Sequence, residues 1–248
     1  MRSRAAARLG PLWRVLNEGL PPDEGQPDEQ AERTKRISDQ LVRLVQVFFG
    51  VVAGQGLVLY RAVVVSPFRH DHIPAALALV SIYVMIVWSW IDWNTSMEDH
   101  PYDFRTRART RLGRWQTRAE RWRLYSDILI VVLYSYMLFQ VKPLTQNPEA
   151  DMRYLLLGYP LVFALYLGSG QLRILRYGPL ASNLRPILEF LGLFVLILIA
   201  YIVLRHTGLS KFWLNCTALV VALATTRAYR MRRHQYGAAR RARLTGAT

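Results

Sequence analysis

The chain has 248 residues, of which 52% are hydrophobic, and it carries 32 Lys and Arg against 17 Asp and Glu residues, a formal net charge of +15. Such a charge is typical of proteins that bind nucleic acid or an anionic membrane surface. The apolar residues gather into long blocks, which favour the membrane and make a nucleic-acid partner unexpected. Because Cys216 is the single cysteine, an intramolecular disulfide and a cysteine-based metal site are excluded.

Residues 1–40 are predicted to form a cytoplasmic N-terminal extension. Within it, residues 9–20 place leucines and Trp13 at helical spacing next to arginines, which indicates a short amphipathic helix on an anionic membrane face. A disordered basic tail is the alternative. Residues 21–32, PPDEGQPDEQAE, are acidic and rich in proline, and they predict a flexible linker.

Six apolar blocks follow, each near the length of roughly 20 residues that a helix needs to cross a bilayer. Their expected boundaries are 42–65, 74–93, 125–141, 154–172, 186–204 and 212–228. The connections after the first, third and fifth blocks are short, so these blocks predict three helical hairpins. The expected fold class is therefore an all-α integral membrane protein with a six-span domain over residues 41–228.

The distribution of basic residues predicts the orientation of these spans. The arginine-rich loop 95–123 and the basic tail 229–248 fall on the same side of the membrane as the N-terminus, and this side holds most of the Lys and Arg residues. The positive-inside rule then places both termini in the cytoplasm. A bacterial cytoplasmic membrane is the expected location.

The first block carries a stripe of polar residues and glycines. Arg43, Gln46, Gly50 and Gly54 recur at steps of three and four residues and so share one helix face, with Gln55 beside them. Gly50 and Gly54 form a GxxxG step that permits close helix approach, and glutamines within a span need polar partners. The stripe is either an ordinary helix-packing surface or a surface that lines a hydrated path or an oligomer interface.

Asp127 lies about one turn into the third block, where an ionised carboxylate requires a cationic partner. Arg43 of the first block lies at a similar depth from the same side. We therefore predict an intramembrane ion pair between Arg43 and Asp127, with Arg123, one turn earlier, as the local alternative.

The loop 95–123 contains the most extreme local composition, RTRARTRLGRWQTRAERWR, with arginines at helical steps and two tryptophans one heptad apart. It predicts an interfacial helix whose tryptophans insert among lipids and whose arginines contact the phosphates of anionic lipids. The same arginines would suit an acidic protein or a nucleotide ligand. The residues concerned are Arg107, Arg111, Arg114, Trp115, Arg118 and Trp122.

The HExxH, Walker A and GxGxxG motifs do not occur, so no catalytic residue, metal or cofactor is expected. The leading functional hypothesis is a non-enzymatic, homo-oligomeric pore or transport-type protein whose first span faces the path. The second is a membrane-anchoring or signalling subunit whose arginine-rich cytoplasmic face recruits an acidic partner, a ligand or anionic lipid. The third is an enzyme that acts on a lipid head group at the junction from Asp92 to His100.

Overall fold

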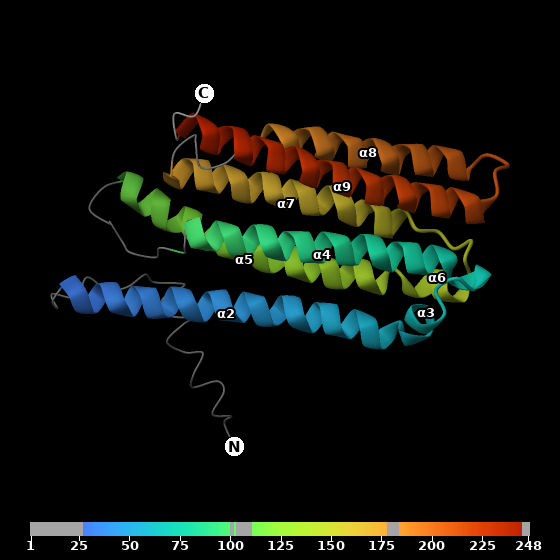
Figure 1. Cartoon of the computed structure of the whole chain (residues 1–248), viewed down its shortest axis with the longest axis horizontal. Helices are drawn as coiled ribbons and strands as arrows, with labels where there is room; N and C mark the ends of the chain where they lie inside the picture. Colours follow the sequence, from blue (N-terminus) through green and yellow to red (C-terminus); the bar gives the residue numbers. More distant parts are fainter. Residues whose placement is uncertain (1–26, 100–101, 103–110, 178–183, 245–248) are drawn as a thin grey trace, which may run out of the picture.

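The computed structural model describes residues 27–99, 102, 111–177 and 184–244, and all regular structure within these ranges is helical. Six long helices run side by side as an elongated bundle (Figure 1). They are α2 (Pro27–Leu59), α4 (Ile73–Asp99), α5 (Arg111–Phe139), α7 (Arg153–Tyr177), α8 (Arg185–Arg205) and α9 (Lys211–Leu244). The shorter elements are α3 (Arg61–Val65), the 3-10 helix η1 (His70–His72) and α6 (Lys142–Gln146).

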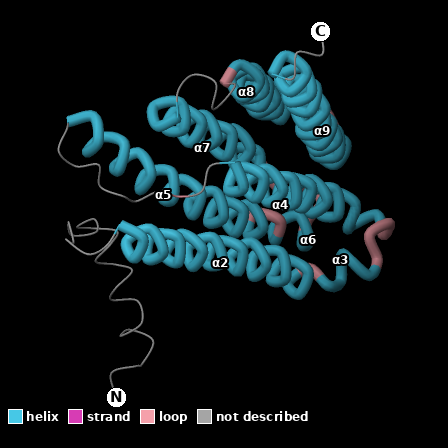
Figure 2. Tube along the Cα trace, turned by 60° about the vertical axis from the view of Figure 1, so that its left-hand side comes forward, coloured by secondary structure: helices cyan, strands magenta, loops and turns pink. Residues whose placement is uncertain are grey.

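The helices surround a common core in an order that differs from their order in the sequence. α5 packs on α7, α7 on α8, α8 on α9, and α9 on α4, while α2 lies at the edge of the bundle along α4 and α5 (Figure 2). The consecutive helices α5 and α7, and α8 and α9, are thus neighbours. In contrast, α4 has a larger contact with α9 than with α2.

The bundle has two chemically different ends. At the end that we call the arginine-rich end, α4, α7 and α9 finish and α2, α5 and α8 begin (Figure 1). The opposite end carries α3, η1, α6 and the turn between α8 and α9.

Five helices within the described ranges are long and apolar enough to cross a membrane, as an integral membrane protein requires. The segments concerned are Lys35–Leu59, His70–Glu98, Arg118–Gln146, Arg153–Ile174 and Arg185–Arg205. The sixth expected block, 212–228, forms the first half of α9 and is not among them. Asn215, Thr225, Thr226 and Arg227 dilute its apolar run.

The start of α2 corrects one prediction. The helix begins at Pro27, so residues 27–32 of the expected flexible linker are helical. Proline suits the first turn of a helix, and the acidic residues that follow it suit the positive end of the helix dipole. The expected amphipathic helix 9–20 lies outside the described residues.

The end of α2 also differs from the expected boundary at residue 65. The helix stops at Leu59, and α3 begins after a break at Tyr60. The buried Tyr60 hydroxyl donates a hydrogen bond to the carbonyl of Leu138 at 2.6 Å, which connects the break to α5. Close by, the Tyr83 hydroxyl of α4 donates to the Ala53 carbonyl of α2 at 2.6 Å.

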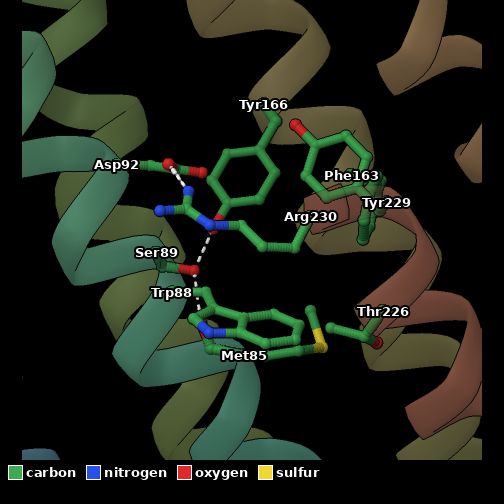
Figure 3. Close-up of a pocket in the computed structure, with 9 residues that line it drawn as sticks. All are labelled: Met85, Trp88, Ser89, Asp92, Phe163, Tyr166, Thr226, Tyr229 and Arg230. Carbon is green, nitrogen blue, oxygen red and sulfur yellow. Dashed lines mark hydrogen bonds and ion pairs between the residues drawn. The ribbon is translucent and has the colours of Figure 1, made fainter. Parts of the chain in front are cut away.

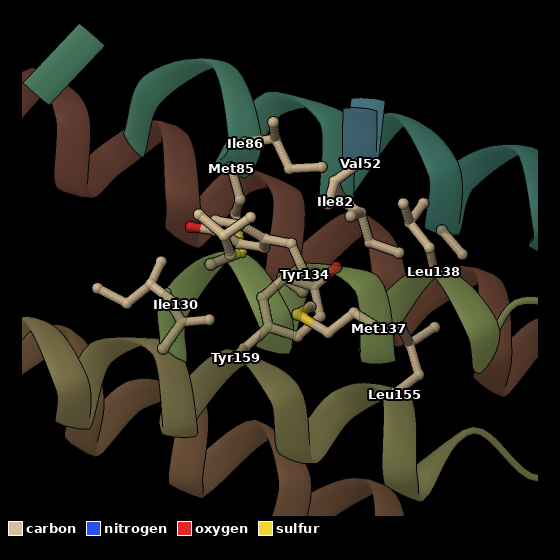
Figure 4. Close-up of a cluster of buried hydrophobic side chains, with 14 of the residues drawn as sticks. Val52, Ile82, Met85, Ile86, Ile130, Tyr134, Met137, Leu138, Leu155 and Tyr159 are labelled. Atoms are coloured by element: carbon tan, nitrogen blue, oxygen red, sulfur yellow. The ribbon is translucent and has the colours of Figure 1, made fainter. Parts of the chain in front are cut away.

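The core between α4, α5 and α7 is filled by aliphatic and aromatic side chains (Figure 4). Ile82 of α4, Tyr134 and Met137 of α5, and Tyr159 of α7 are completely buried. The Tyr159 hydroxyl donates to the hydroxyl of Ser81 at 2.6 Å, so this buried polar group has a partner. The side chains thus join three helices into one packed layer.

Gly158 allows the close approach of α7 to α5. A Cβ atom at this position would lie 2.4 Å from Met137 Cγ and 2.8 Å from its Sδ. Replacement by alanine is expected to lower the free energy of unfolding by about 1–3 kcal/mol, because Met137 must leave its rotamer or the helices must separate. Denaturation in mixed micelles measures this difference.

Gly168→Ala is the matched control, since it lies on the same helix and its added methyl group would meet nothing within 4 Å. It is expected to stabilise α7 by up to about 1 kcal/mol through helix propensity. Equal stabilities of the two variants would show that the contact between Gly158 and Met137 does not limit the packing of α5 on α7.

Candidate functional site

Charged side chains from four helices meet inside the arginine-rich end of the bundle. We call this group the arginine cluster. It comprises Asp92 of α4, Glu120, Arg123 and Asp127 of α5, Arg173 of α7, and Arg230 and Arg233 of α9. Ser96 and Tyr102 are its neutral hydrogen-bond partners.

Asp92 connects α4 to α9. Its Oδ1 atom accepts a hydrogen bond from Arg230, and its Oδ2 atom accepts one from Arg233 Nη1 at 2.6 Å. Because Arg230 and Arg233 are three residues apart, they lie on one face of α9. Both oxygens of Asp92 are therefore engaged by guanidinium groups. His100, the other end of the junction considered for an enzyme, lies outside the described residues.

A small cavity of about 20 Å³ lies beside this contact, bordered by Asp92, Arg230, Ser89 and Tyr166 (Figure 3). Its volume suffices for about one water molecule. The hydroxyl of Ser89 hydrogen-bonds to those of Tyr134 and Tyr166, and the two tyrosine hydroxyls are 3.0 Å apart. The three hydroxyl groups thus extend the polar region from Asp92 toward the apolar core.

Asp127 has a different set of partners from the one predicted. Its Oδ2 atom accepts a hydrogen bond from the Tyr102 hydroxyl at 2.7 Å, and the positive charges that act on it are those of Arg123 and Arg173. Arg43 is exposed on α2, and no ion pair joins it to Asp127 in the described part of the chain. The local alternative, Arg123, is thus one of two arginines whose charges act on Asp127, and no ion pair within 4 Å joins Asp127 to either of them among the described residues.

Tyr102 is held between Asp127 and Arg123. Trp93 Nε1 donates to its hydroxyl at 3.3 Å, and the Arg123 guanidinium lies 5.1 Å from the centre of its ring. Burial, together with the negative charge of Asp127, raises the pKa of Tyr102 well above its ordinary value. The phenol therefore remains protonated and acts as the donor to Asp127.

Arg123 and Arg173 converge on a single acceptor. Arg123 Nη2 and Arg173 Nη1 both donate to Ser96 Oγ, at 3.2 and 2.8 Å. Arg123 is only 1% exposed, yet its Nε and Nη1 atoms have no hydrogen-bond acceptor among the described residues, and neither has Arg173 Nε. Glu120 lies 3.6 Å from Arg123 Nη1, which is ion-pair distance and too long for a hydrogen bond.

A second buried donor lies on the same face of α7. Ser169, one turn before Arg173, is 1% exposed, and its hydroxyl group has no hydrogen-bond partner in the part of the chain that the structure describes. A buried polar group without a partner costs about 1–3 kcal/mol, and more when it is charged. Among the described residues, three guanidinium nitrogens and the Ser169 hydroxyl of this region therefore have no hydrogen-bond partner.

The charges of the arginine cluster are also unbalanced. Its described members are four guanidinium groups and three carboxylates. Positive charge in a partly buried, low-dielectric environment is costly unless an anion accompanies it. Excess charge and unused donors, two independent features, therefore both favour an additional negatively charged group at this site.

Comparisons with protein-family models, with curated proteins and with solved structures find no match to the chain. The function proposed below is therefore inferred from the chemistry of the arginine cluster.

The stripe predicted on the first span lies on the exposed side of α2. Its members, each exposed, are Arg43, Gln46, Gly50, Gly54 and Gln55. Gln46 Nε2 donates to Asn94 Oδ1 of α4 at 3.2 Å, whereas Cβ atoms added at Gly50 or Gly54 would meet nothing within 4 Å. The surface that packs on α4 and α5 is instead apolar and consists of Leu41, Val45, Phe49 and Val52.

The predicted interfacial helix is the beginning of α5. The helix starts at Arg111 and continues without a break into the apolar segment, so it is not a separate element. Trp115, Arg118 and Trp122 are exposed, and the Arg118 guanidinium lies 5.7 Å from the centre of the Trp115 ring. Arg107, and the side chains of Arg111 and Arg114, lie outside the described part.

Several residues of the arginine cluster were not predicted from the sequence, and they lie on the other face of this segment and on distant helices. On α5, Glu120 was not predicted; it is 1% exposed, as is Arg123, the alternative partner named for Asp127. They precede Asp127 at helical spacing, a pattern that indicates a shared charged face on α5. Arg173 and the pair on α9 were counted only as basic loop and tail residues, because nothing in their local sequence marks them as buried.

Proposed function

We propose that the protein spans the membrane six times, as three helical hairpins, with the arginine-rich end in the cytoplasm. Residues 212–226 of α9 contain no charged residue, and α9 packs along α4 and α8. Its polar residues Asn215 and Thr226 are buried and hydrogen-bonded within the bundle, so they add little polar surface facing lipid. The excess of Lys and Arg supports the orientation.

We further propose that the protein is non-enzymatic and that its cytoplasmic end binds an oxyanion of the phosphate type. The observation that supports this is the convergence of Arg123 and Arg173 on Ser96 with three guanidinium nitrogens left without acceptors. Guanidinium groups bind phosphate and carboxylate through paired N–H donors, more strongly than neutral groups do. One oxyanion would neutralise the excess charge and supply the missing acceptors.

Two sources can present this chemistry at a membrane surface, a soluble phosphate compound and the head group of an anionic lipid. Recognition of either would make the protein a membrane-embedded sensor or recruiting subunit, one of the functions expected from its composition. Arg173 is partly exposed and so would be the first of the two arginines to meet an anion from the surface, whereas Arg123 is buried.

Thermal unfolding of the full chain in nanodiscs of neutral lipid tests the proposal. Inorganic phosphate, or phosphatidylglycerol included in the nanodisc, is expected to raise the melting temperature, because a ligand at one hundred times its Kd stabilises by about 2.7 kcal/mol. Whichever addition raises the melting temperature, phosphate or phosphatidylglycerol, identifies the source of the oxyanion. Arg173→Gln is expected to abolish the increase that phosphate produces and to reduce the increase that phosphatidylglycerol produces, since it removes one side of the anion site.

Arg118→Gln is the control, because Arg118 is an exposed arginine at the same end of the bundle. This variant is expected to keep the full anion-dependent increase. A melting temperature insensitive to both phosphate and phosphatidylglycerol would overturn the proposal. Equal loss of the effect in both variants would also do so, because it would reduce the effect to general surface charge.

A second candidate function is a homo-oligomeric pore or transport-type protein in which α2 faces the path. The exposed stripe of Arg43, Gln46, Gly50, Gly54 and Gln55 favours it, since polar groups at this depth are costly against lipid. The small residues Gly50 and Gly54 permit close contact with another helix, and in a homo-oligomer this helix would be α2 of a second copy of the chain.

Gly54→Leu separates these two functions. Within one chain its side chain has free space, so the stability of the monomer is expected to stay within about 1 kcal/mol. In an oligomer joined through α2, the variant is expected to shift the mass measured by light scattering to the monomer and to stop ion flux in liposomes. Gly192→Leu on α8, also unobstructed, is the control. An unchanged mass for Gly54→Leu would contradict the α2 interface.

A further inference from the structure

A second charged site lies at the opposite end of the bundle, where α7 begins, α8 ends and α9 begins. It is a cavity of about 330 Å³, large enough for a small ligand or a lipid head group. Arg153, Arg205, Lys211 and His206 line it together with a single carboxylate, that of Asp151. Tyr201 and Ile202 of α8 complete its wall.

The wall of this cavity is held by a buried hydrogen-bond network. The Tyr201 hydroxyl donates to Asn215 Oδ1 at 3.0 Å and accepts from the backbone N–H of Met152 at 3.1 Å. It also accepts from Arg205 Nη1 at 2.9 Å, and Arg205 Nη2 donates to the Glu149 carbonyl at 3.2 Å. Arg205 is thereby fixed at the edge of the cavity, and it does not depend on a ligand for its position.

The cavity carries more positive than negative charge. Asp151 is shared between Arg153, at 3.2 Å, and Arg205, at 3.7 Å. Lys211 is exposed, and it has no ion-pair partner among the residues that the structure describes. Three permanent cations against one carboxylate leave an excess of positive charge, which favours an anionic occupant.

The apolar side of the cavity indicates what kind of anion fits. Ile202 borders the cavity and is 41% exposed, and Val195 and Ile199 are exposed on the same face of α8 at helical spacing. A continuous apolar face therefore leads along the helix directly to the cationic wall. An occupant with a charged head and a hydrocarbon chain matches both surfaces at once.

We propose that this cavity binds the phosphate head group of an anionic phospholipid, whose acyl chains lie along α8. Lys211 and Arg205 contact the phosphate, and the apolar face of α8 contacts the chains. This site is separate from the arginine cluster, and its existence does not depend on the function proposed for that cluster.

Native mass spectrometry of the full chain, released from micelles with phosphatidylglycerol, tests this site. Lys211→Gln is expected to lower the apparent affinity for phosphatidylglycerol about five-fold, because one basic residue near a lipid phosphate contributes about 1 kcal/mol. Lys142→Gln, an exposed lysine at the same end, is the control and is expected to leave the affinity unchanged. Lys211 is exposed, so its variant is expected to fold normally.

The affinity for phosphatidylglycerol is measured in the wild type and in Arg173→Gln. Because this variant weakens the anion site at the arginine-rich end, the comparison shows how much of the bound lipid belongs to that end. Equal retention of phosphatidylglycerol and phosphatidylcholine would overturn the proposal. Equal losses in Lys211→Gln and Lys142→Gln would do the same, since they would show only general surface attraction. Inorganic phosphate that displaces the lipid completely at millimolar concentration would assign the cavity to a soluble anion and would also overturn it.

Discussion

Asp92→Asn is expected to lower the free energy of unfolding by about 2–4 kcal/mol. The substitution keeps the shape of the side chain but removes the counter-charge of Arg230 and Arg233, which then repel each other. Loss of one partner of a buried ion pair costs about 3–5 kcal/mol, and the estimate is lower here because Arg233 is 36% exposed. Denaturation by SDS in mixed micelles measures the loss.

Asp71→Asn is the matched control, since its ion pair with Arg69 is exposed and such pairs contribute about 0–1 kcal/mol. Adding Arg233→Gln to Asp92→Asn is expected to restore part of the stability, because one of the two uncompensated charges is removed. If Asp92→Asn were no more destabilising than the control, the connection between α4 and α9 through Asp92 would be energetically unimportant.

Asn215→Leu is expected to destabilise the protein by about 3 kcal/mol or more. The completely buried Asn215 Nδ2 donates to the carbonyls of Pro148 and Ala150 at 2.8 and 3.0 Å, and its Oδ1 accepts from Tyr201. Leucine would remove the donor to the two carbonyls and the acceptor of the Tyr201 hydroxyl, at about 1–3 kcal/mol for each group that water does not reach. The same mixed-micelle denaturation measures the effect.

Thr217→Val, an exposed position two residues further along α9, is expected to change stability by no more than about 0.5 kcal/mol. Tyr201→Phe is expected to show an intermediate loss of stability, because it removes one hydroxyl group but leaves Asn215 bonded to the carbonyls of Pro148 and Ala150. A neutral Asn215→Leu variant would show that residues 148–152 are held by other contacts.

The positions of the long helices follow from hydrophobic length, whereas the rotation of α2 does not. In a bilayer the lipid is as apolar as a helix interface, so an apolar face and a face of small and polar residues are both compatible with packing. In the structure it is the apolar face with Phe49 and Val52 that is buried against the bundle. The stripe with Gly50 and Gly54 lies on the outside.

The arginine cluster could not be predicted from the sequence for a different reason. The sequence shows that Asp127 needs a cation, but depth along a helix does not specify which helices are neighbours. Asp92 and Arg233 are 141 residues apart in the chain, and their contact exists because α9 packs on α4. The sequence does show Arg123 one turn before Asp127, and Arg123 is accordingly the alternative partner predicted for Asp127.

The length of α9 has a mechanical consequence. Its 34 residues extend about 50 Å at 1.5 Å per residue, while the apolar layer of a bilayer is about 30 Å thick. The contact with Asp92 lies near the point where the uncharged part of the helix gives way to its basic turns. A pull on the C-terminal turns of α9 would therefore reach α4 through Asp92 and α8 through the ion pair of Arg232 with Glu189 at 2.7 Å.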